Sequence, residues 1–432
     1  MIYRKMKKHD ERSSGKKNNH IRKNAVIISA VIILIVILTG CTNLLDMSIT
    51  HITPHNAPPY VRPPIEQITV SDYDELIETI LKLITEHETE VQLIYYQTEG
   101  EDVQAEISRA IHEIQFEHPI GAYAVARISA EATRIVTHFE IDIEIEYRRT
   151  QEQINSIVNA PTLRYMMTQL LNIMGEYRDE AVFRTRLQFT EEEITEFVRE
   201  IYYQNPRRII MMPAVAVEVF PEEGTDRVYE IKFGYIDDQS ILLGYSENLE
   251  LYVRQEAQRA AGTTDSEILL SLARGLIDST EFDESTARSI HTHGAPNYAA
   301  TAFGALVRGS AVGEGFAMAF KALSDELRFD NRIVLGYYDG MVHAWNVVLL
   351  YGYFYHIDIA MCVVNGIETA FLKSDTDFEE MYTWDRNNTV RCAGDLTLDD
   401  ILGLNDLTDP DDPNGDPDDE LDAGSDNEED EL

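Results

Sequence analysis

The chain has 432 residues, enough for more than one hydrophobic core, and carries a formal net charge of −40 at pH 7. So acidic a protein repels nucleic acid and anionic lipid, and we expect no nucleic-acid partner. It contains only three cysteines, which argues against a disulfide framework. Their spacing suggests no metal cluster, so we expect neither a metal site nor a cofactor.

The N-terminus carries a pattern typical of a secretory signal. Residues 1–24 are basic and polar, residues 25–38 are apolar, and the sequence L-T-G-C comes next, ending at Cys41. This arrangement resembles a bacterial lipoprotein signal. The resemblance implies that residues 1–40 are a signal peptide that is removed and that Cys41 is acylated, so that the protein is extracytoplasmic and lipid-anchored to the cell membrane of a bacterium. A simple N-terminal membrane anchor is the alternative.

Residues 41–70 are polar and rich in proline, which predicts an extended tether between the membrane and the folded part. Ser71 and Asp74 form a capping-box pattern ahead of apolar residues at helical spacing, so we expect folded structure from Ser71 onward. Residues 135–147 alternate strictly between apolar and polar side chains. This alternation predicts a strand with one buried face and one solvated row of carboxylates.

We expect residues 71–260 to form an N-terminal α+β region with a weak internal duplication. Residues 71–147 show alternating helical and strand patterns, including a predicted strand over residues 122–128. A similar order of helix and strands recurs after residue 190. There, a helix capped by Thr190 is followed by β-rich runs at residues 208–212, 215–220 and 228–236. The region lacks a recognisable catalytic constellation, and we interpret it as a packing partner or binding surface for the C-terminal domain.

Residues 313–358 contain the pattern with the clearest chemistry. An amphipathic helix is predicted after Gly313, followed by two β-rich runs at residues 343–349 and 353–358. A turn at residues 350–351 would place His343 directly opposite Asp358, whereas a turn at residues 351–352 would make them diagonal neighbours. In both registers the two side chains share a face within pairing reach. A histidine held by an aspartate beside a helix N-terminus is the base and its orienting group in a nucleophilic triad.

The same residues resemble the transglutaminase-like family, whose fold is that of papain-type cysteine proteases. The resemblance covers about the last third of the chain and implies an α+β domain over residues 261–394, with a helix packed on an antiparallel sheet. It assigns catalytic roles to His343 and Asp358. The matching segments are residues 302–307 (AFGALV), 315–317 (GFA), 343–346 (HAWN), 355–358 (YHID), 371–375 (FLKSD) and 383–385 (TWD).

Gly313 stands where this family has its nucleophilic cysteine, so no covalent acyl intermediate can form at that position. We therefore interpret His343 and Asp358 as a vestigial dyad. Three residues could replace the missing nucleophile: Ser310, Cys362 and Cys392. The simpler interpretation is that Ser310 is a turn residue, that Cys362 fills the core, and that Cys392 has a structural role.

Three functions are consistent with these patterns. The favoured prediction is a lipid-anchored surface protein whose inactive transglutaminase-like domain binds peptides or cell-wall peptide stems. The alternative is an active cysteine peptidase or amidotransferase that uses a displaced nucleophile. In a third interpretation, the domain only scaffolds partners through its N-terminal region.

Two remaining segments are interpreted as non-catalytic. His291 and His293 form an H-x-H pattern without further ligands nearby in the sequence, and we interpret them as loop residues. Residues 395–432 are dominated by Asp and Glu and contain no Lys or Arg, which predicts a disordered acidic tail.

Overall fold

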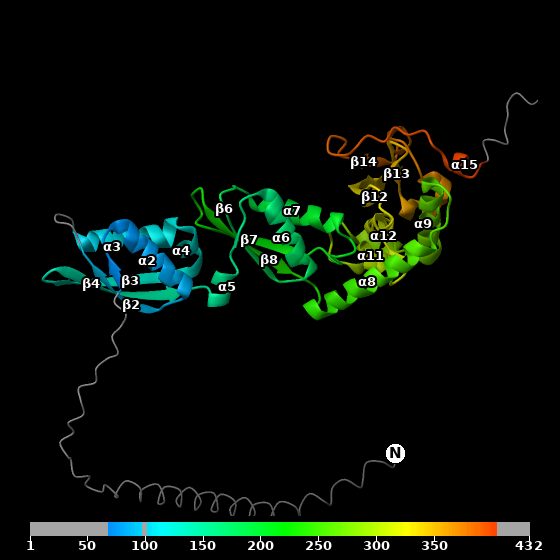
Figure 1. Ribbon diagram of the computed structural model, residues 1–432. Coiled ribbons are helices and arrows are strands. Elements are labelled where there is room, and N and C mark those ends of the chain that lie inside the picture. The colour runs from blue at the N-terminus through cyan, green and yellow to red at the C-terminus, as the bar shows by residue number, and fades with distance from the viewer. Residues whose placement is uncertain (1–67, 97–101, 404–432) are drawn as a thin grey trace, which may run out of the picture. The chain divides into compact units, whose positions relative to one another are not determined.

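A computed structural model describes residues 68–96 and 102–403. These residues lie in one compact unit that spans residues 67–432 and contains three four-stranded sheets and many helices, an α+β fold as predicted (Figure 1). Within the described residues, no helix is both long and apolar enough to span a membrane. The predicted signal peptide, Cys41 and all but the end of the predicted tether fall outside the described residues.

The first sheet is covered by helices on one face (Figure 1). Its order is β1-β2-β4-β3, with β1 parallel to β2 and the other pairs antiparallel. Its elements are β1 (Ile68–Val70), α2 (Tyr73–Glu86), β2 (Glu90–Tyr95), α3 (Val103–His112), a short π-helix (Glu113–Glu117), α4 (Pro119–Ala124), β3 (Val125–Ile135) and β4 (His138–Tyr147).

Three sequence predictions for this region need correction, and one is confirmed. Residues 68–70 form β1, so the tether ends earlier than predicted. Asp72 rather than Ser71 caps α2, because its carboxylate accepts the backbone N–H of Glu75. Residues 122–124 belong to α4, so the strand predicted from residue 122 starts at Val125. The alternation along β4 is confirmed, with isoleucines buried and the carboxylates between them exposed.

The second sheet repeats the topology of the first. Its order is β5-β6-β8-β7, again with one parallel pair followed by two antiparallel pairs. Its elements are α5 (Gln151–Asn155), β5 (Val158–Asn159), α6 (Leu163–Gly175), β6 (Glu180–Thr185), α7 (Glu191–Gln204), β7 (Ala214–Phe220) and β8 (Arg227–Gly234).

The predicted duplication is therefore real in topology, but the second copy spans residues 158–234. Sequence reasoning missed β6 and predicted a strand at residues 208–212 instead. Those residues include Ile209, Ile210 and Met211, which are buried in a turn after α7. A short apolar run in a buried turn has the same pattern as a buried strand.

Helices and short strands connect the second sheet to the third. They are α8 (Gln239–Arg259), α9 (Asp265–Ser279), β9 (Glu281–Phe282), α10 (Glu284–Ser289), a 3-10 turn (Tyr298–Ala300), α11 (Ala302–Leu306) and β10 (Ser310–Ala311). Thr264 and Glu267 cap α9 reciprocally, and β9 pairs in parallel with β10 just before the next helix. This pairing fixes the chain where it enters the candidate site.

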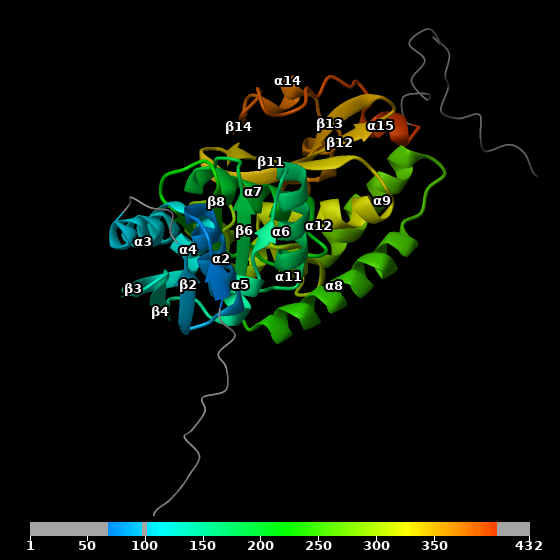
Figure 2. The ribbon, with the colours of Figure 1, turned by 60° about the vertical axis from the view of Figure 1, so that its left-hand side comes forward.

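The third sheet is fully antiparallel, in the order β13-β12-β11-β14, and α12 packs against it (Figures 1 and 2). Residues 398–401 form α15, and Leu396, Leu398 and Ile401 pack against the core, so the predicted disordered tail begins too early. The elements are α12 (Gly313–Glu326), β11 (Asn331–Tyr338), β12 (Met341–Leu350), β13 (Tyr353–Ile357), α13 (Ile359–Asn365), a 3-10 turn (Ile367–Thr369), α14 (Asp375–Phe378), β14 (Tyr382–Trp384) and α15 (Leu398–Ile401).

The second and third sheets share one hydrophobic core, whereas the first sheet has a core of its own. The shared core is reinforced by polar contacts, such as the ion pair between Arg207, after α7, and Glu326, at the end of α12. The second copy of the duplicated region is thus continuous with the packing that holds α12 in place.

Candidate active site

The hairpin of β12 and β13 brings His343 and Asp358 together. Leu350 pairs with Tyr353, so the turn lies at residues 351–352, and Asp358 is the diagonal neighbour of His343. Both turn residues have positive φ, as this tight turn requires. His343 Nε2 lies 2.6 Å from Asp358 Oδ2, and both side chains are buried.

Asp358 is itself held in place by two further hydrogen bonds. The Tyr382 hydroxyl donates to Oδ2 at 2.8 Å, and the backbone N–H of Met361 donates to Oδ1 at 3.1 Å, so the carboxylate also caps α13. An ionised carboxylate only accepts, so Nε2 of His343 carries a proton and donates it. Nδ1 is then the basic nitrogen of the ring, and the dyad is oriented as a general base with its orienting acid.

The basic edge of His343 faces Gly313, the first residue of α12. A Cβ atom built on Gly313 would lie 2.3 Å from both Nδ1 and Cε1 of His343. Real Cβ atoms essentially never come that close to another heavy atom. The imidazole thus occupies the space that any side chain at position 313 would need. The structure brings together the three positions that the sequence singled out, while their catalytic role stays a prediction.

A small pocket opens beside the dyad. Its cavity volume is about 20 Å³, roughly what one water molecule needs. Glu314 and His293 contribute its polar groups besides His343, and its other lining residues are Ala287, Ile290, Val312, Gly313 and Val342.

Glu314 is a buried carboxyl group in this wall. It accepts a hydrogen bond of 2.9 Å from the Tyr203 hydroxyl of α7, and one of 3.2 Å from the backbone N–H of Gly294. Burial raises the pKa of Glu314 to about 7, although these hydrogen bonds act in the opposite direction. The carboxyl group therefore connects α12 to the duplicated region and to the loop that precedes α11.

His293 lies on that loop and supports the strand that carries the dyad. Its Nε2 lies 3.0 Å from the carbonyl oxygen of His343 and 3.1 Å from that of Gly336. Carbonyl oxygens only accept, so Nε2 carries the proton. Burial lowers the pKa of His293, which favours the neutral ring. His293 is thus a loop residue, as predicted, and its hydrogen bonds also position the strand that carries His343.

The residues after His343 in the HAWN segment anchor α12 to the sheet. The side-chain amide of Asn346 donates to the carbonyl oxygen of Ala317 in α12 at 3.0 Å, and to Asn331 Oδ1 in β11 at 2.9 Å. The side-chain amide of Asn331 donates in turn to the Ser324 hydroxyl at 2.8 Å. Because these groups are buried, the network fixes the distance between α12 and β12.

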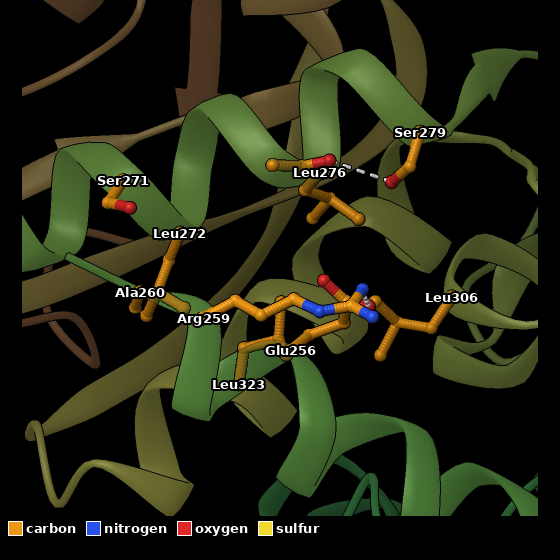
Figure 3. Close-up of a pocket in the computed structure, with 10 residues that line it drawn as sticks. Glu256, Arg259, Ala260, Ser271, Leu272, Leu276, Ser279, Leu306 and Leu323 are labelled. Carbon is orange, nitrogen blue, oxygen red and sulfur yellow. Dashed lines mark hydrogen bonds and ion pairs between the residues drawn. The ribbon is translucent and has the colours of Figure 1, made fainter.

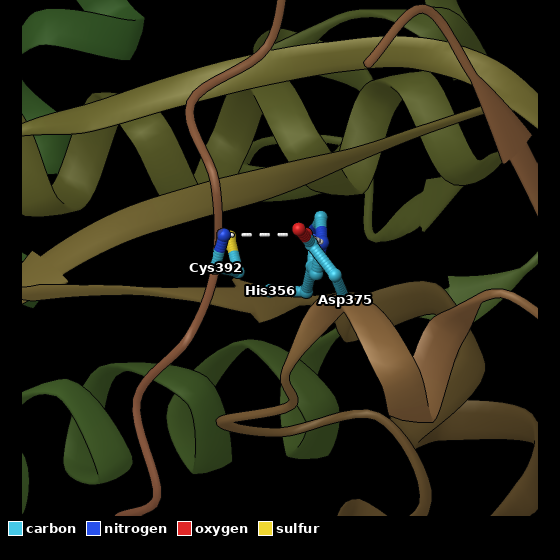
Figure 4. Close-up of side chains that lie close together, drawn as sticks. All are labelled: His356, Asp375 and Cys392. Atoms are coloured by element: carbon cyan, nitrogen blue, oxygen red, sulfur yellow. Dashed lines mark hydrogen bonds and ion pairs between the residues drawn. The ribbon is translucent and has the colours of Figure 1, made fainter.

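A second histidine and aspartate lie close to Cys392 (Figure 4). His356 Nε2 lies 2.9 Å from Asp375 Oδ1, and Trp345 Nε1–H donates to His356 Nδ1 at 2.9 Å. The backbone N–H of Cys392 donates to the same Asp375 oxygen at 3.2 Å. An indole N–H only donates, so Nδ1 accepts and Nε2 carries the proton.

Ligand atoms of these three residues lie within 4.8 Å of one another, close enough for a metal ion. A metal on Nε2 would displace the proton that binds Asp375, while Nδ1 still accepts from the indole. Burial also raises the pKa of the Cys392 thiol to about 12, which disfavours the thiolate ligand. The donor set fits a structural hydrogen-bond network better than a metal centre.

The three alternative nucleophiles are poorly placed. Cys362 and Cys392 are free, buried thiols, and burial raises the pKa of both. Ser310 pairs with Glu281 where β10 meets β9. Within the described part of the chain, none of these three residues lines the pocket at His343.

The sequence matches no protein-family model, and no curated protein is similar to it. The solved structures that show weak similarity to the chain include the following two. One is described as a TGase, with 11% identity, a TM-score of 0.24, and coverage of 50% of this chain and 60% of that chain. The other, described as a cysteine protease from Cytophaga hutchinsonii, has 14% identity, a TM-score of 0.22, and coverage of 36% and 65%. At such TM-scores neither likeness carries weight, so the function proposed for the chain rests on the residues and distances of its own site.

Proposed function

We propose that this protein is a lipid-anchored surface protein of a bacterium, and that its C-terminal domain is an inactive relative of transglutaminase-like enzymes that binds peptides without cleaving them. Cell-wall peptide stems are the favoured ligands, because export and anchoring through Cys41 would place the domain beside them. The observation that carries the proposal is the contact between the base of the dyad and Gly313, with 2.3 Å between Nδ1 and the site of the missing Cβ.

The chemistry supports loss of acyl transfer rather than a changed nucleophile. In a thiol enzyme, a helix N-terminus and an adjacent imidazole lower the thiol pKa so that the thiolate attacks. Here the imidazole and its aspartate persist at a helix N-terminus, but position 313 offers no side chain. Water in a pocket of about 20 Å³ is then the remaining nucleophile. Removing a nucleophile leaves only the rate that binding and electrostatic contacts supply.

The high pKa and burial of Cys362 and Cys392 oppose the alternative enzyme. Such thiols are mostly protonated at neutral pH, and neither cysteine lines the pocket at His343. An electrophilic thiol probe separates the two hypotheses, because an active cysteine peptidase would react at one cysteine much faster than the unfolded chain does.

The direct test combines binding and cleavage in one experiment. Synthetic cell-wall stem peptides and unrelated extended peptides are titrated into the full-length protein by calorimetry, and the mixtures are then analysed by mass spectrometry. We expect a stem peptide to bind and to be recovered intact. Cleaved peptides would overturn the claim of inactivity, and absence of binding to every peptide would overturn the claim about the ligand.

A further inference from the structure

A second, larger pocket lies away from the dyad, between α8, α9, α11 and α12 (Figure 3). Its cavity volume is about 240 Å³, enough for a ligand on the order of ten non-hydrogen atoms. The pocket touches the C-terminal half of α12 at Leu323, whereas Gly313 and the dyad lie at the N-terminal end of that helix. It is thus a separate site.

The floor of this pocket is apolar and its rim is polar. Leu272, Leu276, Leu306 and Leu323 are buried side chains that line it. The other lining residues are two serines, the charged residues Glu256 and Arg259, and the small residues Ala260 and Gly275. A buried apolar floor with a few polar groups at the edge is the usual construction of a small-molecule site, which often lies between helices.

Gly275 keeps the pocket open. It lies in the middle of α9, where glycine destabilises a helix by about 1 kcal/mol relative to alanine. A Cβ atom at this position would meet no atom within 4 Å, so close packing does not require the glycine. A larger side chain would project into the pocket that Gly275 lines.

Arg259 supplies the positive charge in the lining of this pocket, and Glu256 supplies the negative charge. Its side chain extends along the pocket (Figure 3) and is 71% exposed. It is paired with Glu256 at 2.6 Å, one helical turn away on α8, and exposed pairs of this kind are weak. The guanidinium fork can therefore keep Glu256 on one edge and bind a carboxylate with the other.

We propose that this pocket binds a small apolar carboxylate, with the carboxylate on Arg259 and the apolar part over the four leucines. Two sources share this chemistry. One is a medium-chain fatty acid, and the other is an apolar amino acid with a blocked amine, as at a peptide C-terminus.

Octanoate and N-acetyl-leucine represent the two sources, and octanol and octylamine test the headgroup. Calorimetry on the full-length protein should give a dissociation constant in the micromolar to millimolar range for one of the two carboxylates. We expect octanol and octylamine to bind at least tenfold more weakly. Equal affinity for all four compounds, or no binding of either carboxylate, would overturn the proposal.

Matched variants locate the site. Gly275→Leu should weaken carboxylate binding at least tenfold, whereas Gly244→Leu should not, because Gly244 is also a mid-helix glycine with no atom near its Cβ position but lies outside the pocket. Arg259→Gln should remove the preference for carboxylate over alcohol. Its control is Arg254→Gln, which breaks a similar ion pair with Glu250 on the same helix.

The helical circular dichroism of each variant confirms folding before titration. Arg259 is the exposed last residue of α8, so we expect Arg259→Gln to fold. This variant therefore tests the proposal even if Gly275→Leu does not fold. Unchanged carboxylate affinity and selectivity in Arg259→Gln would refute the assigned site, and so would equal weakening in Arg254→Gln.

Discussion

Replacing Gly313 by alanine tests whether the imidazole of His343 truly occupies the space of the missing side chain. The new Cβ would lie 2.3 Å from the ring, whereas ordinary contacts begin at 3.4 Å, so the ring must retreat by about 1.1 Å. A retreat of that size away from α12 would break or distort the 2.6 Å hydrogen bond to Asp358.

The expected energies decide the direction of the effect. Losing a hydrogen bond to a charged group costs about 1.5–3 kcal/mol, and alanine in place of glycine returns at most about 1 kcal/mol of helix stability. We therefore expect Gly313→Ala to destabilise the protein by about 0.5–2 kcal/mol. The control Gly244→Ala lies inside α8 with no atom near the new Cβ, so it should instead stabilise the protein by about 0.5–1 kcal/mol.

Urea unfolding followed by tryptophan fluorescence measures this difference. The chain has two tryptophans, Trp345 and Trp384, and both lie in the third sheet, so the signal reports on the domain that contains the dyad. A lower midpoint for Gly313→Ala than for the wild type is the predicted result. If both glycine variants raised the midpoint equally, the ring would not fill the space, and our reasoning about the site would be wrong.

Three further predictions concern separate groups. Because burial raises the pKa of Glu314 from 4.5 to about 7, the folded state binds this proton more tightly, and its contribution to stability is lost as pH rises from 4.5 to 7. Glu314→Gln should remove a pH-dependent loss on the order of 3 kcal/mol, visible in unfolding midpoints at pH 5 and 8. Tyr382→Phe removes the hydroxyl that donates to Asp358 and should cost about 1–2 kcal/mol in the same assay, whereas an unchanged midpoint would mean that the bond contributes little. Cys41→Ser should move the protein from the detergent phase to the aqueous phase in phase partitioning, and continued detergent partitioning would favour a simple membrane anchor.

The hairpin that carries the dyad was predictable because its signals are local. Alternating β-rich runs and a short turn limited the register to two options, and the structure adopts the one that makes His343 and Asp358 diagonal neighbours. The helix that begins at Gly313 was predictable from its apolar spacing for the same reason.

The rest of the site depends on contacts that leave no local pattern. Tyr203 and Glu314 are 111 residues apart, and neither has neighbours that indicate the other. His293 binds the carbonyl oxygen of His343 from a loop 50 residues earlier, and an H-x-H pattern alone gave no reason to expect that contact. The errors at β6 and at residues 208–212 also come from tertiary contacts. A turn that is buried by the rest of the fold is as apolar as a buried strand, so the sequence pattern does not distinguish the two.

The most direct test of the central claim is covalent labelling followed by intact-protein mass spectrometry. An activated peptide ester or an electrophilic thiol probe is incubated with the wild type, with Gly313→Cys, and with Gly313→Cys combined with His343→Ala. We predict no adduct on the wild type and one adduct on the thiol introduced at position 313. Because a side chain at this position displaces the imidazole from Asp358, removing the imidazole as well should change the rate of that reaction little. Rapid acylation of the wild-type chain at Ser310, Cys362 or Cys392 would contradict the claim that the domain is inactive.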